Sequence, residues 1–164
     1  MKGNEISHVL EAGKTRELIY ELKVEQAMTK DIVTVRPEDT MDDVRNILRD
    51  YKVSGTPVTD GEELVGIVSI EDLIKSLHDG KPKEKVRERM STSVVTLYAD
   101  EPLVHAIQKF EKYGFGRFPV INRKSKKLVG ILTKVDIIRC LLRRLEIDFY
   151  TGEVRRYRLG HLFE

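Results

Sequence analysis

The stretch GIVSIED at residues 66–72 decides the fold, because it recurs as GILTKVD at residues 130–136. In both copies an apolar run ends in a hydroxyl residue, and an aspartate follows three positions later. The match continues to residue 77 at an offset of 64, and it extends back to residue 24 at an offset of 62. The two extra residues of the second copy fall in a turn-like stretch, where length changes cost least. The chain is therefore a tandem duplication.

Each copy predicts a strand, a helix, a hairpin and a second helix, in that order. The ranges expected in the first copy are 32–35, 41–51, 57–59, 64–68 and 73–77. The second copy repeats the pattern with a strand over 94–97 and helices over 103–113 and 137–142. Thr40 is typical of a helix N-cap and Gly114 of a C-terminal stop.

The fold class is therefore α+β, with two β-α-β-β-α repeats. One unit of about 54 residues is marginal on its own. We therefore expect the two repeats to pack sheet to sheet about a pseudo-twofold axis, with two related clefts at the seam.

Two arms flank the repeats. The predicted division is an N-terminal helical arm (1–23), repeat 1 (24–80), a linker (81–85), repeat 2 (86–142) and a C-terminal extension (143–164). The extension carries five arginines, which four acidic residues nearly balance. A solvated tail or a strand packed on a partner is therefore favoured over a nucleic-acid-binding arm.

Composition excludes several classes of protein. Of 164 residues, 29 are Lys or Arg and 27 are Asp or Glu, so the net charge of +2 gives no field that attracts nucleic acid by itself. No apolar run approaches the roughly 20 residues that span a membrane, and the first residues do not resemble a secretory signal. The single Cys140 excludes an intrachain disulfide. The four histidines are scattered along the sequence, so no metal site is predicted. We expect a cytoplasmic protein that is not an enzyme, since no nucleophile with a base and no phosphate loop is visible.

The two aspartates of the repeated motif have two interpretations. A Ser/Thr-x-x-acid motif is a capping box, although a capping box prefers Glu or Gln at the third position. A carboxylate at a cleft edge can instead accept the two hydroxyls of a ribose, and a hydroxyl at a helix N-terminus can contact ribose or phosphate. The sequence leaves both interpretations open.

The duplicated unit and its motifs, together with Thr56-Pro57-Val58 and Phe118-Pro119-Val120, resemble a tandem pair of CBS domains, or Bateman module, over about residues 24–142. Such modules usually bind adenosine-containing ligands. The resemblance implies that Asp72 and Asp136 hold ribose and that Ser69 and Thr133 contact ribose or phosphate. The residues that it implies around adenine are Thr34, Val35, Thr56, Pro57, Thr96, Phe118 and Pro119. It also implies a flat, disc-like homodimer.

The two copies differ in their cations. Arg117 precedes Phe118, where similar modules that sense AMP carry a phosphate-binding residue, whereas its counterpart is Gly55. Lys134 follows Thr133, whereas Ile70 occupies the corresponding position in the first copy. A guanidinium can bind phosphate through two parallel hydrogen bonds, so we expect unequal sites. Which cleft Arg117 serves is open, and a solvated surface charge is the alternative.

The sequence thus predicts a regulatory sensor of AMP, ADP or ATP, without a catalytic cofactor, that acts as a homodimer or on a protein target in trans. One alternative is an S-adenosylmethionine sensor. A second is a nucleic-acid-binding module that uses the Arg-rich tail. A third is a structural adaptor with empty clefts.

Overall fold

A computed structural model of the chain describes residues 13–148, and for residues 146–148 it describes the backbone alone. The parts of the two predicted arms at residues 1–12 and 149–164 lie outside the described residues. Residues 13–21, which belong to the predicted N-terminal arm, are helical.

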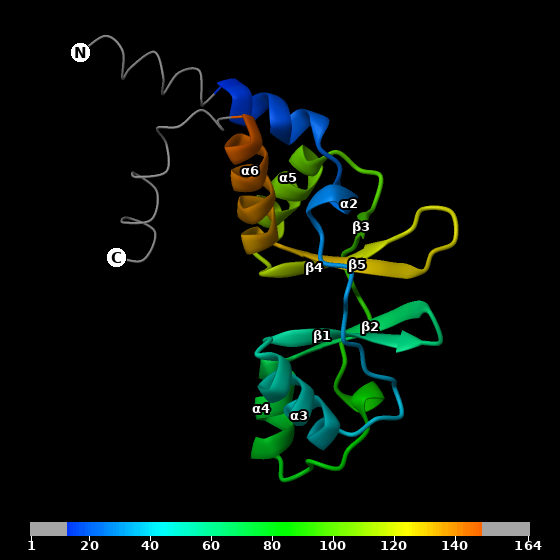
Figure 1. Ribbon diagram of the computed structural model, residues 1–164. Coiled ribbons are helices and arrows are strands. Elements are labelled where there is room, and N and C mark those ends of the chain that lie inside the picture. The colour runs from blue at the N-terminus through cyan, green and yellow to red at the C-terminus, as the bar shows by residue number, and fades with distance from the viewer. Residues whose placement is uncertain (1–12, 149–164) are drawn as a thin grey trace, which may run out of the picture.

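The molecule has four layers, with two sheets facing each other between two pairs of helices (Figure 1). Repeat 1 contains α3 (Met41–Tyr51), β1 (Gly55–Asp60), β2 (Glu63–Ser69) and α4 (Ile70–His78). Repeat 2 contains β3 (Leu97–Tyr98), α5 (Leu103–Tyr113), β4 (Arg117–Ile121), β5 (Leu128–Thr133) and α6 (Lys134–Asp148). Within each repeat the hairpin strands pair antiparallel. The predicted α+β fold of two repeats packed sheet to sheet is confirmed.

Equivalent residues of the two repeats meet across the seam. Arg117 contacts Gly55, its counterpart at an offset of 62, and Lys127 forms a bridge with Glu63, its counterpart at an offset of 64. A twofold axis exchanges equivalent residues of the two repeats, so two equivalent residues can touch only where they lie close to that axis. The pseudo-twofold axis therefore runs along the seam, from the start of β1 to the hairpin ends.

The first helix of each repeat begins and ends as the sequence predicts. Thr40 accepts a hydrogen bond from the backbone N–H of Asp43 at 3.2 Å, and the Asp43 carboxylate accepts one from the Thr40 N–H at 2.8 Å. This is a capping box, which satisfies amides that the first turn leaves free. In repeat 2, Gly114 ends α5 with a positive φ of 65°, a conformation that glycine adopts without strain.

The predicted strands at 32–35 and 94–97 are wrong in extent. Val35 forms a single parallel bridge with Val58, and in repeat 2 the paired residues are Leu97 and Tyr98. The physical reason is that the preceding residues carry the chain from one sheet to the other. Thr29 still pairs with Ile131 of repeat 2, so only the last residues of the stretch reach the sheet of their own repeat.

The leading segments of the two repeats are exchanged. The short helix α2 (Val24–Ala27) packs in the core of repeat 2, where Val24 is fully buried. The 3-10 helix η1 (Val86–Glu88) packs in the core of repeat 1, where Val86 is fully buried. The exchange ties the two repeats together, so each core depends on a segment that the sequence assigns to the other copy.

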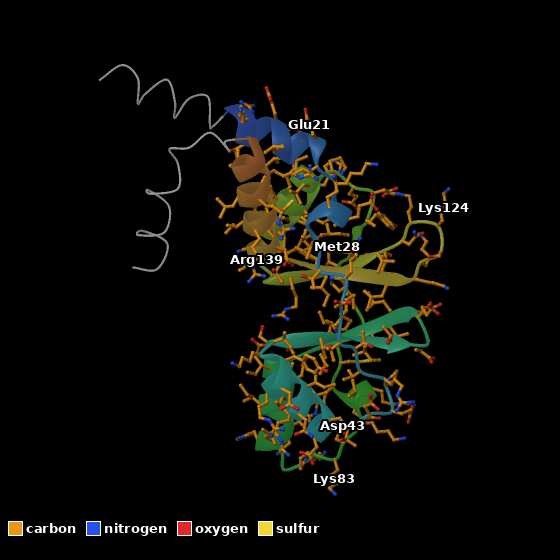
Figure 2. The ribbon with its side chains drawn as sticks, in the orientation of Figure 1. Glu21, Met28, Asp43, Lys83, Lys124 and Arg139 are labelled. Carbon is orange, nitrogen blue, oxygen red and sulfur yellow. The ribbon has the colours of Figure 1, made fainter. Side chains whose placement is uncertain are left out.

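The repeated glycines mark where these segments lie over the sheets. A Cβ atom at Gly130 would come within 2.5 Å of the Met28 sulfur, and one at Gly66 within 2.7 Å of the Met90 sulfur. Figure 2 labels Met28 on the segment that passes β5. Both glycines are therefore required by close packing rather than by a turn.

Candidate functional site

The start of α4 holds the first of the two motif aspartates. The backbone N–H and the hydroxyl of Ser69 both donate to Oδ2 of Asp72, at 2.8 and 2.9 Å. This geometry confirms the capping-box interpretation for one of the two carboxylate oxygens. Among the described residues, none donates a hydrogen bond to the other oxygen, Oδ1. Asp72 is half-buried, so one acceptor remains for a ligand.

The start of α6 holds the second aspartate in a different state. The Thr133 N–H donates to Oδ2 of Asp136 at 2.9 Å, which is the same capping geometry. The hydroxyl of Thr29, however, donates to Oδ1 of Asp136 at 3.1 Å. Asp136 is buried, with 8% of its surface exposed. Both oxygens of this carboxylate therefore already accept hydrogen bonds.

Arg117 connects the two repeats at the start of α4. Its backbone lies opposite Thr133 in the hairpin of repeat 2, but its guanidinium reaches repeat 1. There it donates from Nη1 to the Gly55 carbonyl at 2.9 Å and from Nη2 to the Ser54 hydroxyl. The Ser54 carbonyl accepts the first amide of α4, from Ile70, at 2.9 Å. The guanidinium is therefore held on the Asp72 side of the seam and is no freely solvated surface charge.

Electrostatics at this point couple Arg117 to Glu71. Burial lowers the pKa of the Arg117 guanidinium, and the nearby Glu71 carboxylate opposes that shift. The pKa of Glu71 lies below its usual range because its own backbone amide and the neighbouring Ser69 side chain stabilise the carboxylate, with smaller contributions from Lys75 and Arg117. Charged groups from both repeats thus gather at one helix start.

We call these two residue groups the Asp72 site and the Asp136 site. The Asp72 site comprises Ser54, Gly55, Ser69, Glu71, Asp72 and Arg117. The Asp136 site comprises Thr29, Thr133, Lys134 and Asp136. Lys134 is exposed as the first residue of α6, and its ammonium lies 6.0 Å from the centroid of the Phe110 ring.

The threonines expected around adenine have partners within the chain. The Thr56 hydroxyl donates to the Val33 carbonyl, and the Thr59 hydroxyl donates to that of Thr34 at 3.3 Å. In repeat 2 the Thr96 carbonyl accepts a hydrogen bond from Lys109 at 2.8 Å. These contacts fix the segments that lead into each repeat.

The apolar members of the expected adenine pocket belong to the cores. Val35 is 1% exposed and Phe118 is fully buried, with its ring centroid 4.7 Å from that of Phe110. Pro57 and Pro119 are also buried. Because these side chains are buried, only the backbone groups at these positions could contact a ligand.

A groove of about 510 Å³ lies elsewhere, on repeat 2. Its lining residues are Tyr98, Glu101, His105, Gln108, Lys109, Lys112 and Arg123. Arg123 pairs with Asp100 at 2.9 Å and stacks 4.0 Å from the centroid of the Tyr98 ring. Because two of its cations, Lys109 and Arg123, already have partners in the chain, the groove is a weaker candidate than the seam.

Two residues that shape these sites were not predicted from the sequence. Thr29 and Ser54 carry no motif of their own. A signal for Thr29 exists nonetheless, since it aligns with Ser91 at the offset of 62, directly after the aligned methionines Met28 and Met90. A hydroxyl at both aligned positions is the signal that could have marked Thr29 as a candidate.

Two further properties concern residues 13–148, the part of the chain that the structure describes. No helix in that part of the chain is both long and apolar enough to cross a membrane. Over the same residues, no three His, Cys, Asp or Glu side chains come together in a way that could hold a metal ion.

The family model of the CBS domain matches the chain twice, at residues 24–79 and 86–143. Two proteins of Methanocaldococcus jannaschii are similar to it. The uncharacterized protein MJ1232 is 29% identical over 133 residues, which are 81% of this chain and 44% of that protein. An inosine-5'-monophosphate dehydrogenase is 32% identical over 118 residues, which are 71% of this chain and 23% of that enzyme. The chain thus spans less than half the length of these relatives, and its relatives include enzymes.

Solved structures of CBS pairs show the same fold. CBSX2 of Arabidopsis thaliana, solved in complex with AMP, is 29% identical with a TM-score of 0.66, covering 75% of this chain and 98% of that one. The CBS domain pair of protein MJ0100, solved with 5′-methylthioadenosine and S-adenosyl-L-methionine, is 28% identical with a TM-score of 0.65 and the same coverage. The two matched segments together make up more than half of the chain, and this protein therefore belongs to the CBS-domain family, as a tandem CBS-domain pair.

Proposed function

We propose that this protein is a regulatory sensor that binds an adenosine-containing ligand of the AMP, ADP or ATP type at the seam between its repeats, without catalysing a reaction. One observation carries the proposal: the Asp72 site combines an available carboxylate oxygen from repeat 1 with the Arg117 guanidinium from repeat 2. A ribose diol offers two donors and a phosphate offers anionic acceptors. Such a ligand would contact both repeats at once.

Arg117 keeps capacity for a phosphate. A guanidinium has five N–H donors, and two of them are used by Gly55 and Ser54. The remaining donors are available for charge-assisted hydrogen bonds, which are about twice as strong as neutral ones. Ser69 and Thr133 are proposed to contact ribose or phosphate at their respective sites, and Lys134 is the corresponding cation beside Asp136.

The adenine base would lie against the segments that lead into and out of the first hairpin strand of each repeat. The proposed lining positions are Thr34, Val35, Thr56 and Pro57, with Thr96, Phe118 and Pro119 at the second site. Since several of these side chains are buried, their backbone N–H and C=O groups would recognise the base. The ligands of the CBSX2 and MJ0100 structures all contain adenosine, which supports this class.

A thermal-shift panel tests the proposal with AMP, ADP, ATP, S-adenosylmethionine, NAD and a short RNA at millimolar concentration. A ligand at 100 times its dissociation constant stabilises the protein by about 2.7 kcal/mol, a shift that is easily measured. A response to S-adenosylmethionine alone would favour the methyl-donor sensor over the nucleotide sensor. Binding of RNA that weakens steeply with salt would favour the nucleic-acid-binding module. No response to any ligand would favour the structural adaptor.

A matched pair of variants separates ligand binding from helix capping. Asp72→Ala removes both the proposed ribose acceptor and a capping box, whereas Asp43→Ala removes the equivalent capping box of α3, away from the seam. Both variants should lose about 1 kcal/mol of stability. Only Asp72→Ala should also show a smaller ligand-induced shift. An Asp72→Ala protein that responds like the parent would refute the ribose assignment.

Arg117→Met tests the phosphate contact. We expect it to weaken AMP binding about 10-fold while leaving adenosine binding nearly unchanged, because only the phosphate would lose a charged partner. Equal losses for AMP and adenosine would show that Arg117 shapes the site without contacting phosphate.

We further propose a homodimer, which would present the sensor to a protein target in trans. Helix α4 exposes Ile70, Ile74 and Leu77 on one face, and α6 exposes Val135 and Ile138 on its equivalent face. In a twofold-symmetric dimer this apolar face would pack against the same face of the second copy. Replacing Ile74 and Ile138 together by Glu should give a monomer in sedimentation velocity. An exposed control, Gln108→Glu on α5, should leave the dimer intact.

A further inference from the structure

We infer that the two sites are unequal because Thr29 closes one of them: its hydroxyl occupies the oxygen of Asp136 that a ribose would use, which leaves the Asp72 site as the primary ligand site. This inference rests on the proposed adenosine-binding function. It assigns a specificity role to Thr29, a residue of the segment that crosses from repeat 1 to repeat 2.

The two carboxylates differ at one oxygen. In both, Oδ2 accepts the amide of the preceding cap residue, at 2.8 Å for Asp72 and 2.9 Å for Asp136. Oδ1 of Asp136 accepts the Thr29 hydroxyl at 3.1 Å, whereas Oδ1 of Asp72 has no donor among the described residues. A ribose hydroxyl would have to displace Thr29 at Asp136, but it would displace no protein group at Asp72.

The difference lies in a side chain and not in the path of the backbone. Thr29 and Ile131 exchange two backbone hydrogen bonds of 2.9 and 3.0 Å, and the equivalent Ser91 and Ile67 exchange two of 2.9 Å. The Ser91 side chain nevertheless makes no hydrogen bond within the described part of the chain, and Ser91 is exposed. Ser91 is therefore a natural control for Thr29.

The position of Arg117 adds to the difference between the two sites. The guanidinium of Arg117 lies at the Asp72 site, and its counterpart Gly55 supplies no side chain toward the Asp136 site. A Cβ atom at Gly55 would lie 3.1 Å from the Val68 carbonyl oxygen, so there is little room for a side chain there. Lys134 is the cation left for the Asp136 site, and its ammonium lies near the Phe110 ring. Two independent features thus favour the Asp72 site.

Isothermal titration calorimetry with AMP tests the inference on the full chain. We expect the parent to bind one equivalent tightly and a second about 10-fold to 100-fold more weakly, since a hydrogen bond to a charged group must be displaced. Asp72→Ala should remove the tight event. Thr29→Val and Thr29→Ala should strengthen the weak event about 10-fold, while Thr29→Ser, which keeps the hydroxyl, and Ser91→Ala should leave both events unchanged. Two equal events in the parent, or loss of the tight event in Asp136→Ala alone, would overturn the inference.

A measurement without ligand keeps the inference separate from the proposed function. Thr29→Val and Asp136→Ala, combined in a double-mutant cycle of urea unfolding, should be non-additive by about 10-fold in the unfolding equilibrium constant. Additive effects would show that the hydrogen bond is not formed in solution and would overturn the role of Thr29. If the cycle shows coupling but no panel ligand binds to any variant, the proposed function fails and the assignment of a primary site fails with it.

Discussion

Gly130→Ala is the substitution that tests most directly how the two repeats are held together. A Cβ atom at this position would lie 2.5 Å from the sulfur and 2.9 Å from Cγ of Met28, and 3.0 Å from the carbonyl oxygen of Thr29. Ordinary carbon contacts begin near 3.5 Å, so the crossing segment would have to move by about 0.5–1 Å. The flexible end of Met28 can turn away, but the Thr29 carbonyl is held by the Ile131 amide at 3.0 Å.

The expected cost follows from overpacking. Extra methyl groups in a well-packed interior cost about 1–3 kcal/mol. For a chain of this length, each kcal/mol shifts the melting temperature by about 2–4 °C, so Gly130→Ala should lower it by about 2–12 °C. Gly66→Ala should act in the same direction with a similar or smaller effect, because its nearest contact, to the Met90 sulfur, is 2.7 Å. Differential scanning calorimetry measures both variants.

Two further proteins make this test decisive. Gly116→Ala is the control, since a Cβ atom there would meet nothing within 4 Å, and its melting temperature should stay close to that of the parent. In a Met28→Ala background, the cost of Gly130→Ala should fall, giving an interaction energy of about 0.5–3 kcal/mol in a double-mutant cycle. If Gly130→Ala were as stable as Gly116→Ala, the close packing of the crossing segment on β5 would be wrong.

Three other predictions concern the framework around the sites. Phe118→Ala should lose about 3–5 kcal/mol in urea unfolding, because a fully buried ring beside Phe110 is replaced by a cavity; a loss below 1 kcal/mol would contradict its place in the core. Thr40→Ala should lose about 1 kcal/mol through the N-cap of α3, whereas Thr40→Ser should keep most of the stability. The hydrogen bond from Arg89 holds the pKa of Asp79 below its usual range. The Arg89–Asp79 pair therefore stabilises the fold above about pH 4, and this stabilisation is lost as the pH falls through the lowered pKa. Urea unfolding at pH 7 and pH 3 should therefore show a smaller acid-induced loss in Arg89→Met than in the parent, and an equal loss would contradict the role of this pair.

Local patterns in the sequence predict the helices and hairpins well, because their causes are local. Thr40 caps α3 through a residue three positions later, and Gly114 ends α5 through its own backbone freedom. The apolar residues that the periodicity selects in α3, such as Val44 and Leu48, are buried. In each case the deciding contacts lie within one turn of the residue that signals them.

The exchange of the leading segments has no such local signal. Val24 and Val86 are apolar and align with each other, which predicts burial but not the core in which each is buried. The same limit explains the shortened strands, since residues that cross between sheets have the composition of residues within one. The position of Arg117 also depends on this long-range arrangement, because its guanidinium bonds to residues 62 and 63 positions away.

The two interpretations of the repeated aspartate are compatible because a carboxylate has two oxygens. At both sites Oδ2 is committed to the start of a helix, and this role alone accounts for an acidic residue at the third position. The proposed role in binding depends on Oδ1. At Asp136 this oxygen is bonded to Thr29, a residue more than one hundred positions away. The motif by itself therefore predicts a capped helix at both positions. What differs is the hydrogen bonding of Oδ1. At the Asp136 site a ribose would first have to displace the Thr29 hydroxyl, whereas at the Asp72 site it would displace no protein group. By this criterion a duplication that preserves the motif can still leave one primary site.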